Sequence, residues 1–179
     1  MNETKKQIEM VFQASDDDPE VLECMRTNAN CVKLQKYADE QRETFKTEIE
    51  QSHASAEVGT SVIDNAVRVF CTSLTRETVL SITELLGSLS SSSDSNWHAV
   101  ALGVRGVAAK SQSIMDEVTS MAVEACERLV SENPSNAGDS EQLLNRLTDT
   151  VYAYVNSSSS KLDLASGYSI AVVRLAASK

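Results

Sequence analysis

The chain has 179 residues, of which 41% are hydrophobic and 4% aromatic, so it can bury one domain-sized core built mainly from aliphatic side chains. Its formal net charge of −10 would repel a nucleic acid or an anionic lipid surface, which argues against both as partners. No segment approaches the roughly 20 consecutive apolar residues of a transmembrane helix, so we expect no membrane insertion.

Apolar residues recur at helical spacing along nearly the whole chain, and only six glycines and two prolines interrupt it. The first expected helix covers about residues 3–14. Asp18 followed by Pro19 predicts the next helix start, because aspartate caps free N–H groups and proline fits the first turn. This second helix should end near residue 29, so that residues 1–31 form a short helical hairpin.

The middle of the chain predicts longer helices at about residues 31–53, 62–89 and 96–132. Gly59 should break or kink the chain before the second of these, and Thr75 should cap its continuation. The serine-rich stretch 88–96 is typical of a loop, since its hydroxyls cannot pack a core.

Two further helices are expected at about residues 139–155 and 161–177, joined by the serines at 157–160. Helices of different lengths joined by polar loops predict an all-α, antiparallel multi-helix bundle. We therefore expect a single helical domain over residues 1–179, with an N-terminal hairpin at 1–31 and the bundle at 32–179.

The four cysteines suit two disulfides, for which three pairings are possible. Cys24 and Cys31 flank the turn-prone Asn28-Ala29-Asn30, which favours a bond between them and leaves Cys71 to pair with Cys126. The alternative is four buried thiols in an intracellular protein, because cysteine is among the most buried residues.

Two glycosylation sequons, at Asn2 and Asn156, agree with a disulfide-bonded, secreted protein. The first residues lack the apolar stretch of a signal peptide. We therefore expect a secreted, mature chain from which the leader has been removed.

The sequence offers few groups for catalysis. Its two histidines, His53 and His98, stand in no H-x-x-x-H or H-E-x-x-H arrangement, and the cysteines form no C-x-x-C motif. No phosphate-binding glycine loop and no G-x-S-x-G motif is present. We expect a protein that is not an enzyme and has neither a metal nor a cofactor.

Two local features have competing interpretations. The acidic run from Asp16 to Asp18 could bind a cation, but a helix cap with extra acid near the positive helix end explains it more simply. Trp97 and His98 could form a binding edge or a pH-sensitive contact. The simpler interpretation is an amphipathic ring at the bundle end beside a solvated histidine.

Two stretches resemble the folded domains of spider silk proteins. The residues from Asp149 to Tyr154, followed by the serines at 157–160 and Lys161-Leu162, resemble part of spidroin N-terminal domains. Cys71 followed by the apolar stretch 79–88 resembles spidroin C-terminal domains. The resemblance implies a structural protein that is soluble when stored and self-associates on cue, with Cys71 as a disulfide former.

The expected function is a non-catalytic, secreted structural or assembly domain that self-associates through helix faces into a homo-oligomer. The alternative is a secreted helical binding protein, either an inhibitor of another protein or a carrier of a small apolar ligand. Plant invertase and pectin-methylesterase inhibitors are also four-cysteine bundles with an N-terminal hairpin, although their cysteine spacings differ from those in this chain.

Overall fold

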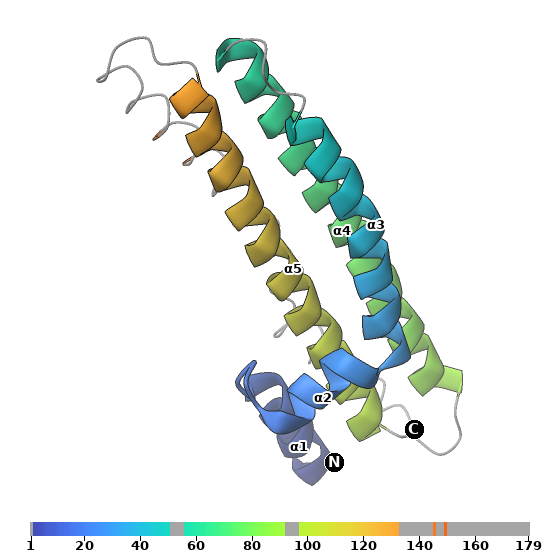
Figure 1. Cartoon of the computed structure of the whole chain (residues 1–179). Helices are drawn as coiled ribbons and strands as arrows, with labels where there is room; N and C mark the ends of the chain where they lie inside the picture. The colour runs from blue at the N-terminus through green and yellow to red at the C-terminus, as the bar shows by residue number, and fades with distance from the viewer. Residues whose placement is uncertain (1, 51–55, 92–96, 133–144, 146–148, 150–179) are drawn as a thin grey trace. The chain divides into compact units, whose positions relative to one another are not determined.

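The computed structural model describes residues 2–50, 56–91 and 97–132, together with Asn145 and Asp149. Within this part the chain forms the helices α1 (Asn2–Gln13), α2 (Pro19–Thr27), α3 (Ala29–Glu50), α4 (Ala56–Ser91) and α5 (Trp97–Glu132), and no strand (Figure 1). The helices pack against each other, which confirms the all-α bundle. The helices expected at 139–155 and 161–177 lie outside the described residues.

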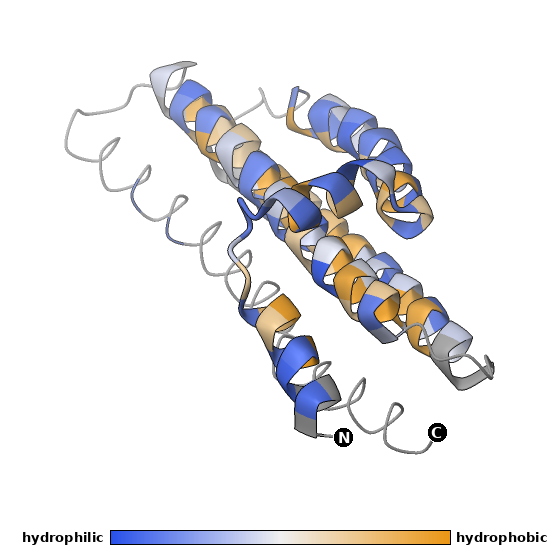
Figure 2. Cartoon of the chain, turned by 90° about the horizontal axis from the view of Figure 1, so that it is seen from below, coloured by the Kyte–Doolittle hydropathy of each residue, from blue (hydrophilic) through white to orange (hydrophobic). Residues whose placement is uncertain are grey.

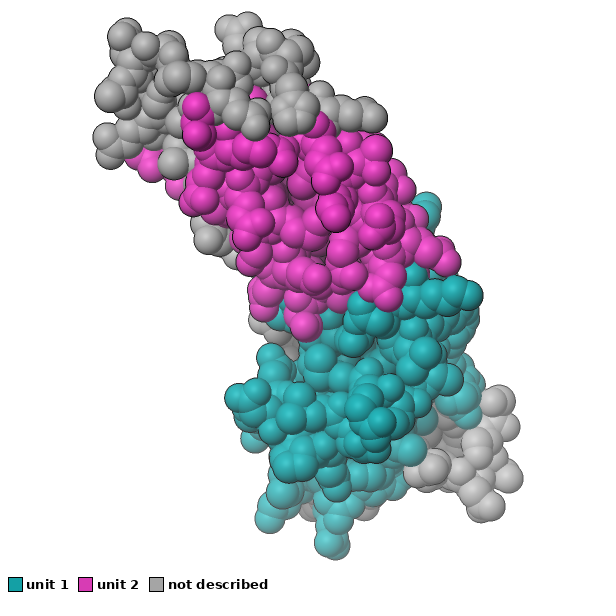
Figure 3. Space-filling view, in the orientation of Figure 1, with its two compact units in different colours: residues 1–36, 75–112, 160–179 teal, residues 37–74, 113–159 magenta. Residues whose placement is uncertain are grey.

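The chain divides into two compact units, coloured teal and magenta in Figure 3. Unit 1 comprises Met1–Lys36, Thr75–Gln112 and Ser160–Lys179, and unit 2 comprises Tyr37–Leu74 and Ser113–Ser159. Each unit thus draws on segments that are distant in the sequence. The single domain expected over residues 1–179 stays a prediction.

The start of α2 is set by local hydrogen bonding, as the sequence predicts. The Asp18 carboxylate accepts the backbone N–H of Glu20 at 2.9 Å, and Pro19 occupies the first helical position. Arg105 on α5 binds the segment between α1 and α2: it donates to the carbonyl oxygen of Ala14 at 2.9 Å and forms an ion pair with Asp16. Asp16 and Asp18 therefore have separate structural roles in unit 1.

A single residue, Asn28, separates α2 from α3. Its backbone N–H donates to the carbonyl oxygen of Cys24, and its side-chain oxygen accepts the N–H of Asn30, each at 2.9 Å. Asn28 thus closes one helix and caps the next, since its extended backbone ends the first helical path. The expected turn is present, but it is shorter than the sequence suggested, and α3 begins at Ala29 instead of residue 31.

The expected break at Gly59 and the separate cap at Thr75 are wrong, because α4 is continuous from Ala56 to Ser91. No described glycine has a positive φ, so Gly59 adopts the same helical path as its neighbours. A glycine inside a helix costs about 1 kcal/mol, which the burial of residues such as Ile63 and Val67 outweighs. The helix also continues into the serine stretch that was expected to be a loop.

The core of each unit is mainly aliphatic, and Figure 2 shows apolar and hydrophilic residues on different sides of the helices. In unit 2 the rings of Phe45 and Phe70 pack edge to face, with centroids 5.7 Å apart. Buried aliphatic residues of the same unit include Ile49, Ile63, Val67, Leu74, Ile114, Met115, Val118 and Leu129. In unit 1 the hydroxyls of Thr78 and Ser111, both fully buried, are hydrogen-bonded at 3.0 Å.

Contacts within each unit give the helix directions. In unit 1, Thr78 contacts Ser111 and Leu85 packs over Gly103, so α4 and α5 are antiparallel there. In unit 2, Arg42 pairs with Glu117 at 2.6 Å and Arg128 donates to the carbonyl oxygen of Ile49 at 2.9 Å. Because both residue numbers rise together, α3 and α5 run in the same direction in that unit.

Candidate functional site

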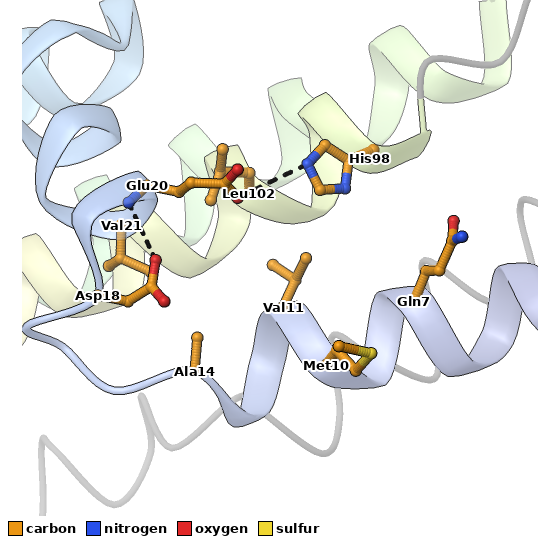
Figure 4. Close-up of a pocket in the computed structure, with 9 residues that line it drawn as sticks. All are labelled: Gln7, Met10, Val11, Ala14, Asp18, Glu20, Val21, His98 and Leu102. Atoms are coloured by element: carbon orange, nitrogen blue, oxygen red, sulfur yellow. Dashed lines mark hydrogen bonds and ion pairs between the residues drawn. The ribbon is translucent and has the colours of Figure 1, made fainter.

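A half-open pocket of about 390 Å³ lies in unit 1 where α1, α2 and α5 meet (Figure 4). Its lining residues are Gln7, Met10, Val11, Ala14, Asp18, Glu20, Val21, His98 and Leu102. The size suits a short alkyl chain or one protein side chain, at the lower end of the range for small-molecule sites.

Helical periodicity explains why these residues share one pocket. On α1 the lining residues Gln7, Met10 and Val11 follow each other at intervals of three and one, which places them on one face, and Ala14 directly follows the helix. On α5, His98 and Leu102 are four residues apart and likewise share a face. The capped first turn of α2 contributes Glu20 and Val21, so the Asp18 cap helps to position the third wall.

The inner wall of the pocket is apolar. Val21 is 1% exposed and Val11 is 8% exposed, whereas Met10 is 62% exposed. Figure 4 shows Val11 pointing from α1 into the space below α2 and α5, and Met10 is the neighbouring lining residue on the same helix. A methionine adapts its shape to different neighbours, so this exposed thioether gives the pocket an adjustable apolar wall.

The rim of the pocket is polar and mainly acidic. It carries the carboxylates of Asp18 and Glu20, and the only basic side chain among the lining residues is His98. His98 Nε2 lies 3.9 Å from Glu20 Oε2, and both side chains are at least half exposed, so water screens the pair. With two carboxylates and one histidine, the rim favours a cationic over an anionic group.

Trp97 precedes this rim and stacks against His98. The two rings are edge to face, with centroids 5.8 Å apart and planes 87° apart. His98 is exposed, as expected for a solvated histidine beside an amphipathic ring. Trp97 is the only tryptophan in the chain, so its fluorescence reports on the neighbourhood of the pocket.

The four cysteines are buried, and none of them forms a disulfide in the structure. Cys24 and Cys31 lie together in unit 1 and share a hydrogen bond. This bond lowers the pKa of Cys24 and raises the pKa of Cys31, because the Cys24 thiolate accepts the S–H of Cys31. Burial acts in the opposite sense on Cys24 and in the same sense on Cys31, since it raises both pKa values. The Cys24–Cys31 bond stays a prediction, now between adjacent groups.

Cys71 and Cys126 are both in the core of unit 2. Burial, followed by the neighbouring charge of Glu127, raises the pKa of Cys126 to about 11. Such a thiol is a poor nucleophile at neutral pH, in contrast to a reactive cysteine. A bond between Cys71 and Cys126 remains a prediction.

Other predicted site residues lie at or beyond the edge of the described part. His53 and Asn156 are outside it, and Asn2 is the first residue of α1. Among the described residues, no group of three or more histidine, cysteine, aspartate or glutamate side chains could hold a metal ion. None of the described helices combines the length and the apolar character needed to cross a bilayer.

Sequence reasoning missed the pocket itself. The helical pattern at residues 3–14 predicts an element there but no pocket, and it does not single out Met10. The pocket depends on where α1 lies against α5, which the Arg105 contacts to Ala14 and Asp16 hold across about 90 residues of sequence. A local pattern contains no signal for such a contact.

The chain matches no family model, no curated protein and no solved structure. The resemblance to spidroin domains therefore stays a prediction. What the fold and the pocket define is a class: an all-α helical bundle protein with an acidic-rimmed, half-open apolar pocket.

Proposed function

We propose that the protein is a non-catalytic helical binding module, and that the pocket between α1, α2 and α5 receives an apolar group that carries a positive charge. The observation behind this proposal is Met10, a large apolar side chain that is 62% exposed beside a buried valine wall. An exposed apolar side chain beside a buried apolar wall gives a ligand apolar area to cover.

The charge of the rim determines which apolar group fits. Asp18 and Glu20 lie on the rim, and the whole chain carries a net charge of −10. An alkylammonium ion or a lysine side chain combines a short apolar stem with a cationic head, whereas a fatty acid would place its carboxylate against this rim. Secretion, suggested by the two sequons, remains part of the proposal.

Titration with simple alkyl probes tests the proposal. Octylamine, octan-1-ol and octanoate have the same chain length and differ only in head group, and each can be added below its aggregation concentration while Trp97 fluorescence is recorded. We expect octylamine to bind most tightly, octan-1-ol less tightly and octanoate least. Equal binding of octylamine and octanoate would contradict the assignment of a cationic ligand.

Variants locate the binding site. Met10→Lys places a cation in the mouth of the pocket and should abolish octylamine binding. Val79→Lys is the control, because Val79 is an exposed residue on α4 outside the pocket, and this variant should bind octylamine like the unmodified chain. Glu20→Gln should weaken octylamine by about fivefold or less, as expected for an exposed charge pair worth up to about 1 kcal/mol, without affecting octan-1-ol. Unchanged octylamine binding by Met10→Lys would disprove the pocket as the site.

A second candidate function is self-association, which the sequence analysis expects. Large aliphatic side chains are exposed outside the pocket, among them Leu22, Val32, Val79 and Leu80. Leu80 is 51% exposed on α4, so contact with a second copy could remove it from water. Sedimentation velocity at rising concentration tests this candidate, with Leu80→Lys expected to shift any dimer back to monomer.

A further inference from the structure

The one-residue corner at Asn28 brings two cysteines together. Cys24 lies in the last turns of α2 and Cys31 in the first turn of α3, and their thiols are hydrogen-bonded. Both sulfurs also face the same point on α5. A Cβ atom built on Gly106 would lie 2.5 Å from Cys24 Sγ and 3.4 Å from Cys31 Sγ. Only glycine leaves room for the pair.

The two thiols differ in their access to solvent. Cys24 is 8% exposed and lines an open pocket of about 540 Å³ between α2 and α5, whereas Cys31 is fully buried. The other residues that line this pocket are Pro19, Glu20, Glu23, Thr27, Asn28, Ala99 and Leu102. A small reagent entering the pocket therefore meets Cys24 first. The two glutamates favour an uncharged reagent over an anionic one.

The electrostatics of the pair agree with this difference. The hydrogen bond with Cys31 lowers the pKa of Cys24, although the Cys24 thiol also donates to the carbonyl oxygen of Leu102 at 3.3 Å, which favours its protonated form. The pKa of Cys31 is raised by the same hydrogen bond and by burial. Cys24 is thus the more readily ionised of the two and the better nucleophile.

We propose that Cys24 and Cys31 form a reversible redox site in which Cys24 reacts with a hydroperoxide and Cys31 closes the disulfide. The Cys24 thiolate attacks the terminal peroxide oxygen, the O–O bond breaks, and protonation releases water or an alcohol, leaving a sulfenic acid. The Cys31 sulfur then attacks the Cys24 sulfur, an S–S bond forms, and the sulfenic oxygen leaves as water. Two thiols are oxidised by two electrons, and the hydroperoxide is reduced by two.

The site is independent of the proposed ligand pocket, although Glu20 and Leu102 line both pockets. It also differs from a permanent structural disulfide, because two equivalents of glutathione should restore both thiols and form one glutathione disulfide. The inference stands whether or not octylamine binds.

Tryptic mapping of the full chain tests the proposal directly. Cleavage after Lys6, Arg26 and Lys33 puts Cys24 on peptide 7–26 and Cys31 on peptide 27–33, while Cys71 and Cys126 fall on peptides 69–76 and 111–128. After exposure to hydrogen peroxide and blocking of remaining thiols, peptides 7–26 and 27–33 should be found joined. Glutathione should separate them. A bond that resists glutathione, or no joined peptide at all, would overturn the proposal.

Single variants separate the two roles. In Cys31→Ser the Cys24 sulfenic acid has no partner, so a dimedone adduct should accumulate on peptide 7–26. In Cys24→Ser peptide 27–33 should stay unmodified, and Cys126→Ser should behave like the unmodified chain. Circular dichroism checks that each variant folds. Equal dimedone labelling of Cys24 and Cys126 would show that oxidation does not distinguish Cys24 from a buried core thiol, and would contradict the assignment.

Discussion

At the scale of single residues, three helical glycines differ in what surrounds them. A Cβ at Gly106 would lie 2.5 Å from the Cys24 sulfur, one at Gly103 would lie 3.1 Å from the flexible end of Leu85, and one at Gly87 would meet nothing within 4 Å. Close packing therefore requires glycine at Gly106. A larger residue can be tolerated at Gly103, and at Gly87 the glycine only destabilises the helix.

Replacing each of these glycines by alanine should give three different results. Gly106→Ala should lower the free energy of unfolding by about 1–3 kcal/mol, because the Cys24 side chain must move within a packed corner. Gly87→Ala should raise it by about 0.5–1 kcal/mol, since alanine reduces the freedom of the unfolded chain at no steric cost. The free energy of unfolding of Gly103→Ala should lie between those of the other two variants. Urea denaturation in reducing buffer measures all three, and equal stability of Gly106→Ala and Gly87→Ala would refute the packing argument.

At the scale of the elements, Asn28 joins α2 to α3 through a hydrogen bond at each helix end. Asn28→Ala should lower the free energy of unfolding by about 1 kcal/mol, because the N–H of Asn30 loses its acceptor. Asn28→Asp retains a side-chain oxygen at the same place and should stay within about 0.5 kcal/mol of the unmodified protein. Both values come from urea denaturation; an equal loss in the two variants would mean that the side-chain oxygen does not stabilise the corner.

Features set by neighbouring residues could be predicted from the sequence, whereas features set by distant residues could not. The start of α2 was predicted because the Asp18 cap acts over two residues. Gly59 was misinterpreted because its local preference competes with burial along a 36-residue helix, which a short window does not include. Cys24 and Cys31 lie near the same glycine, Gly106, because a single short corner joins their helices, whereas the bond between them stays a prediction. The pocket was missed because Arg105 holds its walls across distant sequence.

At the scale of the whole molecule, charge opposes the self-association that exposed aliphatic side chains favour. Each chain has 26 acidic and 16 basic residues, so two copies repel each other at neutral pH. Carboxylates begin to gain protons near pH 5, and about 0.5 M salt shortens the range of charge repulsion to a few ångströms. Either change lowers the repulsion without altering the apolar surface.

Sedimentation velocity should therefore show a dimer that grows both from about pH 7.5 to about pH 5 and, at about pH 7.5, with added salt. Leu80→Lys should weaken the dimer under both conditions, because it removes apolar area that the contact would bury. An unchanged monomer at high concentration under both conditions would contradict self-association. If lower pH promotes the dimer but salt does not, general charge repulsion is the wrong cause, because salt screens every exposed charge. Protons instead neutralise particular carboxylates. The dimer contact would then contain acidic side chains that face each other.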